Sequence, residues 1–202
     1  MKHIRDHFQK VDVILFAALE QTGGLEEISS RHTDYFVALC DEIVSQQLSG
    51  KVATVIFERF RKLFPKGNIT AKAVLKLTHE QLRAVGMSNA KAKYIKDLAE
   101  KVVNQEISLD ALVIMENEQV IEELTKIKGI GRWTAEMFLM FTLKRKDIFS
   151  HGDLGLKNAI KKLYLLENPT KEQIEIITIK WSPYRTYACR ILWNSLDNAP
   201  KL

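Results

Sequence analysis

Apolar residues recur at helical spacing along almost the whole chain. Between residues 33 and 48 they fall three or four positions apart, which is typical of one buried stripe on a helix. Similar stripes, bounded by glycine, proline and capping residues, predict further helices within residues 11–19, 52–64, 70–103 (three short ones), 116–127, 131–144, 155–165 and 170–179, and a last one near the end of the chain. No stretch of alternating polarity is long enough for a sheet. The sequence therefore predicts an all-α protein.

Capping signals set several of the expected boundaries. Thr78, with Gln81 three residues later, predicts a capping box at the start of one of the short helices. Ser88 predicts the start of the next one. Ser182 and Pro183 are typical of an N-cap and a first-turn proline, and they predict the start of the last helix.

The composition is that of a globular protein. The chain has 202 residues, of which 46% are hydrophobic and 27% charged, so it can bury a substantial core in one large or two small domains. It has no run of about eighteen apolar residues, and its first twelve residues, MKHIRDHFQKVD, are not of signal-peptide type. We therefore expect no membrane association and a cytoplasmic location, at the nucleoid if the source is bacterial.

Residues 120–157 carry most of the candidate chemistry. Gly129 and Gly131 interrupt two helical runs, so the chain can turn tightly and point consecutive N–H groups at an anion such as phosphate. One carboxylate, Asp153, follows a short loop just before another helical segment. The net charge of +5 and a pI near 9.1 favour a polyanionic partner. Basic residues cluster around the turn and after the second run, at Lys126, Lys128, Arg132 and residues 144–146.

Metal and disulfide chemistry find little support in the sequence. Cys40 and Cys189 both lie in apolar helical contexts, which favours buried free thiols over a disulfide or a metal site. The five histidines show no zinc-ligand spacing. We therefore expect no metal cofactor.

Three segments, in order, resemble the helix-hairpin-helix superfamily of base-excision DNA glycosylases. LTKIKGIGRWTAEMFLM and WSPYRTYACRILW are most similar to its 3-methyladenine DNA glycosylase II branch, and SQQLSGKVA lies upstream at a matching position. The resemblance implies two helical lobes with an active-site cleft between them, built as a single compact unit over residues 1–202. The N- and C-terminal helices would share one lobe, and roughly residues 50–165 would form the second lobe with the hairpin.

Asp153 is the catalytic residue that the resemblance implies. It would align a water molecule or stabilise the cationic sugar that develops as the base departs. A fixed negative charge in a water-poor site is suited to that task, because it lowers the barrier more than it would in water. The alternative is that Asp153 only caps the helix that follows it. The loop before it lacks the proline that is common in relatives, and His151 in that loop is interpreted as an exposed residue rather than a substrate contact.

The resemblance also implies an aromatic pocket for the damaged base. Its members would be Trp133 and Met137, one helical turn apart, together with Trp193, Tyr184 and Tyr187. Alkylated purines are cationic, so electron-rich rings attract them, by about 0.5 to 2 kcal/mol per contact. Trp133 replaces the lysine that attacks the sugar in the strand-cutting branch, which predicts a glycosylase without lyase activity. Core packing is the alternative for each aromatic residue.

Two further elements would contact the DNA. The resemblance implies that the hairpin residues Lys128, Gly129, Ile130 and Gly131 hold a phosphate through backbone amides, where a monovalent cation can bind but is not required. Arg132 would contact the DNA backbone beside them and adds positive charge. Extruding a base costs a few kcal/mol, and Gln47 or Leu48 would fill the gap in the stack. The alternative for this loop is an ordinary polar helix end. The iron–sulfur cluster of other branches needs four cysteines and cannot form here.

The sequence thus predicts a monomeric, monofunctional DNA glycosylase. It would flip out and hydrolyse alkylated purines such as 3-methyladenine and 7-methylguanine from double-stranded DNA and leave an abasic site. Two alternatives remain open: a non-catalytic helix-hairpin-helix DNA-binding protein, and a glycosylase for deaminated or oxidised bases.

Overall fold

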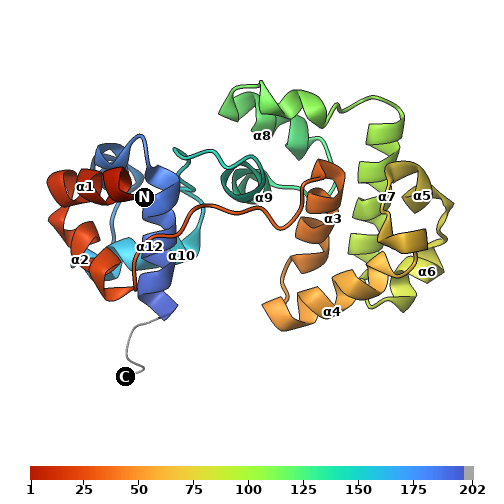
Figure 1. Ribbon diagram of the computed structural model, residues 1–202, viewed down its shortest axis with the longest axis horizontal. Helices are drawn as coiled ribbons and strands as arrows, with labels where there is room; N and C mark the ends of the chain where they lie inside the picture. Colours follow the sequence, from red (N-terminus) through yellow and green to blue (C-terminus); the bar gives the residue numbers. More distant parts are fainter. Residues whose placement is uncertain (198–202) are drawn as a thin grey trace. The chain divides into compact units, whose positions relative to one another are not determined.

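The computed structural model describes residues 1–197, and every regular element within them is a helix (Figure 1). The all-α prediction is confirmed for this part of the chain. Contacts between Cα atoms divide the chain into two units. One unit contains Met1–Ser29 and the chain from Lys144 onward, and the other contains Ser30–Leu143. In the described part, no helix is long and apolar enough to cross a membrane.

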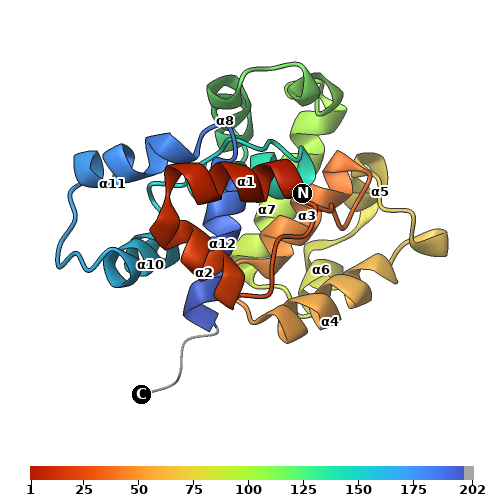
Figure 2. The same cartoon turned by 60° about the vertical axis from the view of Figure 1, so that its left-hand side comes forward.

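The first unit combines the two ends of the chain, and Figure 2 shows α1, α2, α10 and α12 of this unit. α12 packs against α10 and α2, and α1 packs against α2 and η4. Phe8, Leu15 and Leu19 from the N-terminal part are completely buried or nearly so. The N-terminal residues therefore help to build the core of the unit that carries Asp153. Its elements are α1 (Lys2–Val11), α2 (Val13–Gln21), α10 (Leu154–Leu163), α11 (Lys171–Thr178), the 3-10 turn η4 (Ile179–Trp181) and α12 (Arg185–Asp197).

Asp12 separates the first two helices and anchors this core. Its Oδ1 atom accepts hydrogen bonds from two amides in the first turn of α2, at 3.2 and 3.1 Å. Its Oδ2 atom accepts from the Tyr164 hydroxyl at 2.6 Å and from the Trp181 indole at 2.9 Å. The sequence analysis expected a helix over residues 11–19 and missed α1. Ile4 and Phe8 are the buried side chains of α1, and two apolar positions are too few to mark a stripe.

The second unit is built around α7, its longest helix, which contacts both α3 and α5 (Figure 1). α3 also packs against α4, and α8 packs against α9. The elements of this unit are α3 (Tyr35–Ser45), α4 (Gly50–Arg61), η1 (Pro65–Gly67), α5 (Ala71–Lys76), α6 (His79–Ala84), α7 (Asn89–Val103), η2 (Asp110–Val113), α8 (Asn117–Thr125), α9 (Arg132–Met137) and the π-helical turn η3 (Phe138–Thr142). α8, the turn after it and α9 form the predicted hairpin.

The capping predictions have mixed outcomes. The capping box at Thr78 is confirmed, and Ser88 caps α7 as expected. The prediction for the last helix is wrong, because α12 begins at Arg185 and not directly after Ser182. The carboxylate of Asp147 accepts hydrogen bonds from the Ser182 hydroxyl at 2.8 Å and from the Arg185 amide at 3.2 Å. These bonds hold the residues before Arg185 in a turn outside the helix.

The division between the units differs from the expected lobes. The sequence predicts a second lobe of roughly residues 50–165, whereas the contacts group residues 30–143. α3 belongs to the second unit because it packs against α4 and α7, and α10 belongs to the first because it packs against α12 and α2. That residues 1–202 act as one compact body with a cleft stays a prediction.

Candidate active site

Asp153 lies at the N-terminus of α10 with only 8% of its surface exposed. Its Oδ1 atom accepts a hydrogen bond from the Leu156 amide at 2.8 Å, so Asp153 is the N-cap of the helix. The same oxygen accepts from the indole Nε1 of Trp193 at 3.2 Å. The expectation that Asp153 caps this helix is therefore confirmed, and the two bonds also fix the direction of the carboxylate. The catalytic role of Asp153 stays a prediction.

A glycine gives the Trp193 indole room beside this carboxylate. A Cβ atom on Gly155, in the first turn of α10, would stand 3.4 Å from two indole atoms and 3.1 Å from Asp153 Oδ1. Because a Cβ would be unusually close to the carboxylate and in contact with the indole, Gly155 belongs to the candidate site. The sequence analysis missed it. The available signal was a glycine two positions after the candidate acid.

The segment before Asp153 is fixed by side chains of α12 and of the turn that precedes α12. The Thr186 hydroxyl donates to the carbonyl of Arg145 at 2.6 Å. Asp147 accepts from Arg185 Nε at 2.8 Å and from the Ser182 hydroxyl. Burial opposes the ionisation of Asp147, but the hydrogen bonds from Arg185 and Ser182 outweigh it and hold the pKa of this carboxyl below its ordinary value. The base of the loop is therefore held without a proline.

The loop itself contains His151, whose side chain is about one third exposed. Its Nε2 atom lies 2.8 Å from a carboxylate oxygen of Glu175 in α11. Its ring packs edge-on against Phe149, with the centroids 4.9 Å apart. His151 thus connects the loop to its own unit, and a substrate contact is not needed to explain its position.

The tyrosines and tryptophans of the first unit differ in environment. Trp181 is completely buried and donates to Asp12, so core packing explains it. Tyr187 is 4% exposed, and its ring lies 6.4 Å from that of half-buried Tyr184. Tyr184 also meets the ring of His7 edge-on at 5.2 Å. Because these contacts already occupy the tyrosines within their unit, their place in a base pocket stays a prediction.

The hairpin turn presents fewer amides than the sequence suggests. Lys128 donates its amide hydrogen to Asp97 Oδ2 at 2.9 Å, and Ile130 donates to the carbonyl three residues earlier at 3.1 Å. The amides of Gly129 and Gly131 have no hydrogen-bond partner within residues 1–197. The predicted phosphate contact of residues 128–131 therefore narrows to the two glycine amides. That contact itself stays a prediction.

The basic side chains around the hairpin are paired with carboxylates. Arg132 donates to both carboxylate oxygens of Glu118 at 2.9 and 2.6 Å and to Glu136 at 3.0 Å. The hydrogen bonds that Arg132 donates to Glu118 are the main cause that raises the pKa of Arg132. Lys126 and Lys128 also form ion pairs, each with one acid of the same unit. Arg132 thus connects α8 to α9, and its predicted contact with DNA is untested.

Trp133 and Met137 lie one turn apart on α9, as predicted, but their exposure differs. Trp133 is 44% exposed, whereas Met137 is buried at the point where α9 continues into the π-helical turn. A buried methionine cannot present its side chain on the surface. The indole of Trp133 is therefore the stronger candidate of the two for stacking on a base.

The loop between α3 and α4 carries both candidates for stack insertion. Gln47 is exposed and adopts a left-handed conformation with φ of 56°, and Leu48 is also exposed. The base of the loop is tied down by Lys91, whose ammonium donates to the carbonyls of Val44 and Gln46 at 2.8 and 2.7 Å. The loop is thus more than an ordinary helix end. Which of its residues enters a DNA stack, if either does, is untested.

These elements coincide with a known family. The model of the helix-hairpin-helix GPD superfamily of base-excision DNA repair proteins matches residues 40–183. The chain belongs to this superfamily. The match includes the exposed loop, the hairpin and Asp153, so the resemblance that the three sequence segments suggested is confirmed.

One relative and two solved structures show which branch of the superfamily this chain resembles. DNA-3-methyladenine glycosylase 1 of Schizosaccharomyces pombe is 36% identical over 156 residues, which cover 76% of this chain and 68% of the relative. The 3-methyladenine DNA glycosylase Mag1 of that yeast, solved with abasic DNA, superposes with a TM-score of 0.86 and 31% identity over 99% of both chains. A DNA-3-methyladenine glycosidase of Bacillus halodurans superposes with a TM-score of 0.83 and 35% identity, covering 95% of this chain and 89% of that one.

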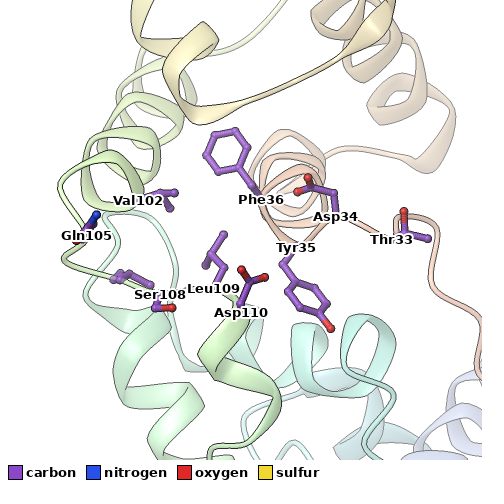
Figure 3. A pocket seen from close by; sticks show the side chains of 10 residues that line it. Thr33, Asp34, Tyr35, Phe36, Val102, Gln105, Ser108, Leu109 and Asp110 are labelled. Atoms are coloured by element: carbon purple, nitrogen blue, oxygen red, sulfur yellow. The ribbon is translucent and has the colours of Figure 1, made fainter.

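This superfamily member also has a pocket that none of its predicted site residues lines. It lies in the second unit, between the start of α3 and the segment that follows α7, and its volume is about 850 Å³ (Figure 3). Asp34 and Asp110 make its lining acidic, which does not suit a nucleic-acid phosphate. The residues that line it are Thr33, Asp34, Tyr35, Phe36, Val102, Gln105, Ile107, Ser108, Leu109 and Asp110.

Cys40 and Cys189 are both buried free thiols, as expected. Among the described residues, no group of three or more histidine, cysteine or acidic side chains is arranged to hold a metal ion. The expectation that the enzyme uses no iron–sulfur cluster stays a prediction.

Proposed function

We propose that this protein is a monofunctional DNA glycosylase that hydrolyses alkylated purines from double-stranded DNA and leaves an abasic site. Membership of the base-excision superfamily and the names of its relatives give the reaction class and the substrate class. The observation that carries the chemistry is the buried carboxylate of Asp153, held by the first turn of α10 and by the Trp193 indole. A carboxylate that is already oriented needs little rearrangement when charge develops on the sugar.

The bond that breaks joins the sugar to a base that is already a good leaving group. Purines methylated at a ring nitrogen such as N3 or N7 carry a positive charge, so the departing base needs no strong general acid. The carboxylate of Asp153 stabilises the positive charge that grows on the deoxyribose, or orients the water molecule that attacks it. The base takes the electron pair of the broken C–N bond and leaves as a neutral molecule. Water then forms the new C–O bond at the same sugar carbon, and the proton that it loses passes to the carboxylate or to solvent.

The protein offers no amine for strand cleavage at the position used by bifunctional relatives. Trp133 cannot form a Schiff base with the sugar. The nearby Lys126 and Lys128 form ion pairs, with Glu123 of α8 and Asp97 of α7 respectively. We therefore expect an intact strand after base release, with breaks only after alkaline treatment.

DNA is the expected partner, bound by a monomer. The amides of Gly129 and Gly131 would hold one phosphate, with an optional monovalent cation and no other cofactor. Trp133 and Trp193 would supply the aromatic faces for a cationic base. We expect the enzyme to act in the cytoplasm, at the nucleoid in a bacterium.

The test is release of bases from methylated DNA, with 3-methyladenine and 7-methylguanine measured separately and strand breaks scored before and after alkali. Wild-type protein should release 3-methyladenine, and Asp153→Asn should slow release at least about a hundredfold. Asp34→Asn is a matched control, because Asp34 caps α3 through the same kind of bond, at 3.0 Å to the Val37 amide. It should leave release unchanged. No release by the wild type would refute the proposal.

A second candidate is a non-catalytic DNA-binding protein, and the N-cap bond of Asp153 is the observation that favours it. In that case Asp153→Asn would alter only stability, and the wild type would bind duplex DNA without freeing bases. Release of an oxidised or deaminated base, with methylated purines left in place, would support the other alternative from the sequence, a glycosylase for deaminated or oxidised bases.

A further inference from the structure

A single lysine, Lys91, holds the base of the exposed loop of residues 46–49, which lies between α3 and α4. Lys91 Nζ donates to the carbonyls of Val44 and Gln46, at the C-terminal end of α3. A helix end has carbonyls without partners in the helix, and an ammonium group satisfies them well. Lys91 therefore fixes the point where the chain leaves α3 and enters the loop.

The same loop is joined to the hairpin by Gln46. Its side-chain Nε2 donates to the carbonyl of Gly129 at 2.8 Å, across 83 residues of sequence. Gly129 is also one of the two turn residues whose amides have no hydrogen-bond partner among residues 1–197. The carbonyl of Gly129 thus accepts a hydrogen bond from the loop, and it lies next to the amides that are proposed to bind phosphate.

α7 supports both elements with one face. Lys91, Tyr94 and Asp97 follow each other at three-residue steps, so their side chains share one side of the helix. The Tyr94 ring lies directly under the hairpin, because a Cβ on Gly129 would stand 2.1 Å from its Cδ2 atom. Asp97 accepts the Lys128 amide hydrogen and pairs with the Lys128 ammonium at 3.2 Å. The loop and the hairpin are therefore braced on the same helix within the second unit.

We propose that Gln46 and Lys91 are positioning residues that hold the tip of the loop at a fixed place relative to the phosphate-binding turn of the hairpin. This inference rests on the proposed function. Extruding a base costs a few kcal/mol, and the side chain that fills the gap must arrive in register with the gripped phosphate. A loop that swings freely would lose that register. Gln47 needs such support in particular, because a left-handed conformation is strained for a non-glycine residue.

The variants Gln46→Met and Lys91→Met remove the two connections while keeping the length of the side chains. Lys93→Met is the matched control, since Lys93 is an exposed lysine of the same helix with no hydrogen bond or ion pair to the described chain. Lys91→Arg keeps donors at the end of α3 and should restore part of any loss. All variants are first compared by thermal unfolding, so that a misfolded one is recognised.

Base release is then measured at saturating enzyme on two substrates. In one the methylated base is paired in a duplex, and in the other it lies in a single-base bulge that is extruded at little cost. Gln46→Met and Lys91→Met should slow release from the paired substrate about tenfold, and release from the bulge by no more than about twofold. Affinity for DNA that already contains an abasic site should stay within about twofold of the wild type. Equal slowing on both substrates, or no slowing in folded variants, would overturn the proposal.

A second readout does not depend on catalysis. Hydrogen exchange of the amides in residues 46–50 and 128–131 should accelerate together in Gln46→Met, and not in Lys93→Met. Acceleration in only one of the segments would also overturn the inference. If the wild type releases no base, the proposed function fails, and the exchange experiment still decides whether the two elements are coupled.

Discussion

The hairpin turn and the segment that leads to Asp153 both place irregular backbone at the start of a helix, yet they are supported differently. The turn lies on α7, where Tyr94 leaves no space above its ring for a side chain on Gly129. The segment before Asp153 is held by polar bonds to residues about forty positions later, through Asp147 and Thr186. Close packing thus fixes the candidate DNA-binding turn, and a charged hydrogen-bond network fixes the approach to the candidate acid.

This difference predicts different responses to change. A packed turn tolerates no added volume, because the Tyr94 ring already occupies the space beside Gly129. A network that depends on a carboxylate tolerates added volume better and weakens in acid. The predictions below test this contrast.

The largest effect is expected for Gly129→Ala. The backbone has φ of 84° there, and the added methyl group would overlap the Tyr94 ring, so the free energy of unfolding should fall by about 3 kcal/mol. Gly131→Ala, whose Cβ would meet nothing within 4 Å, should cost less than about 0.5 kcal/mol. Urea denaturation of both variants measures the difference.

Gly24→Ala separates backbone strain from overlap in this test. Gly24 has φ of 100°, and no atom lies within 4 Å of its would-be Cβ, so only strain should appear, at about 1 kcal/mol. If Gly129→Ala and Gly24→Ala cost the same, Tyr94 does not brace the turn and the contrast between the two regions is wrong.

An intermediate effect is expected for Asp147→Asn. Loss of the charge-assisted bonds to Arg185 and Ser182 should lower the free energy of unfolding by about 1.5 kcal/mol at neutral pH. Because the folded state lowers the pKa of Asp147, its contribution is present above the ordinary pKa and is lost as the pH falls below about 4. The gap between wild type and variant should therefore close in acid, which a pH series of urea denaturations would show.

Asp6→Asn serves as the comparison for that series, since Asp6 is an exposed acid of the same unit. Its effect should be small at every pH. A gap for Asp147→Asn that stays constant down to the lowest pH would mean that the carboxylate charge does not hold the segment.

The helices and the hairpin could be predicted from the sequence because their signals are local. Helix starts are marked by capping residues such as Thr78 and Ser88, which bond to amides within one turn of themselves, and the hairpin turn is marked by Gly129. A pattern of apolar positions shows which face of a helix is buried. The family resemblance added Asp153 and the aromatic candidates. That Asp153 caps the next helix was also expected from the sequence, but its hydrogen bond from the Trp193 indole came only from the structure.

Contacts between distant residues could not be predicted in the same way. Asp12 binds Tyr164 and Trp181, which lie more than 150 residues away, and Gln46 binds Gly129 across 83 residues. Nothing near Trp181 in the sequence distinguishes this core indole from Trp193, the indole that lies beside the candidate acid. Only the packing of α12 on α10 and α2 decides which of them faces Asp153.

The smallest effect on stability, and the sharpest separation of stability from activity, is expected for Gly155→Ala. Alanine favours a helix over glycine by up to about 1 kcal/mol, which should offset the mild crowding of a Cβ placed 3.1 Å from Asp153 Oδ1 and 3.4 Å from the indole. The free energy of unfolding should therefore change by less than about 0.5 kcal/mol.

Base release by Gly155→Ala should nevertheless slow about tenfold, because a small displacement of an oriented carboxylate weakens its effect on the developing charge. Gly152→Ala, with nothing within 4 Å of its Cβ, is the control and should leave release unchanged. Equal rates for Gly155→Ala and the wild type would show that the packing of Trp193 against α10 does not set the position of the acid, and that its bond to the Leu156 amide alone suffices.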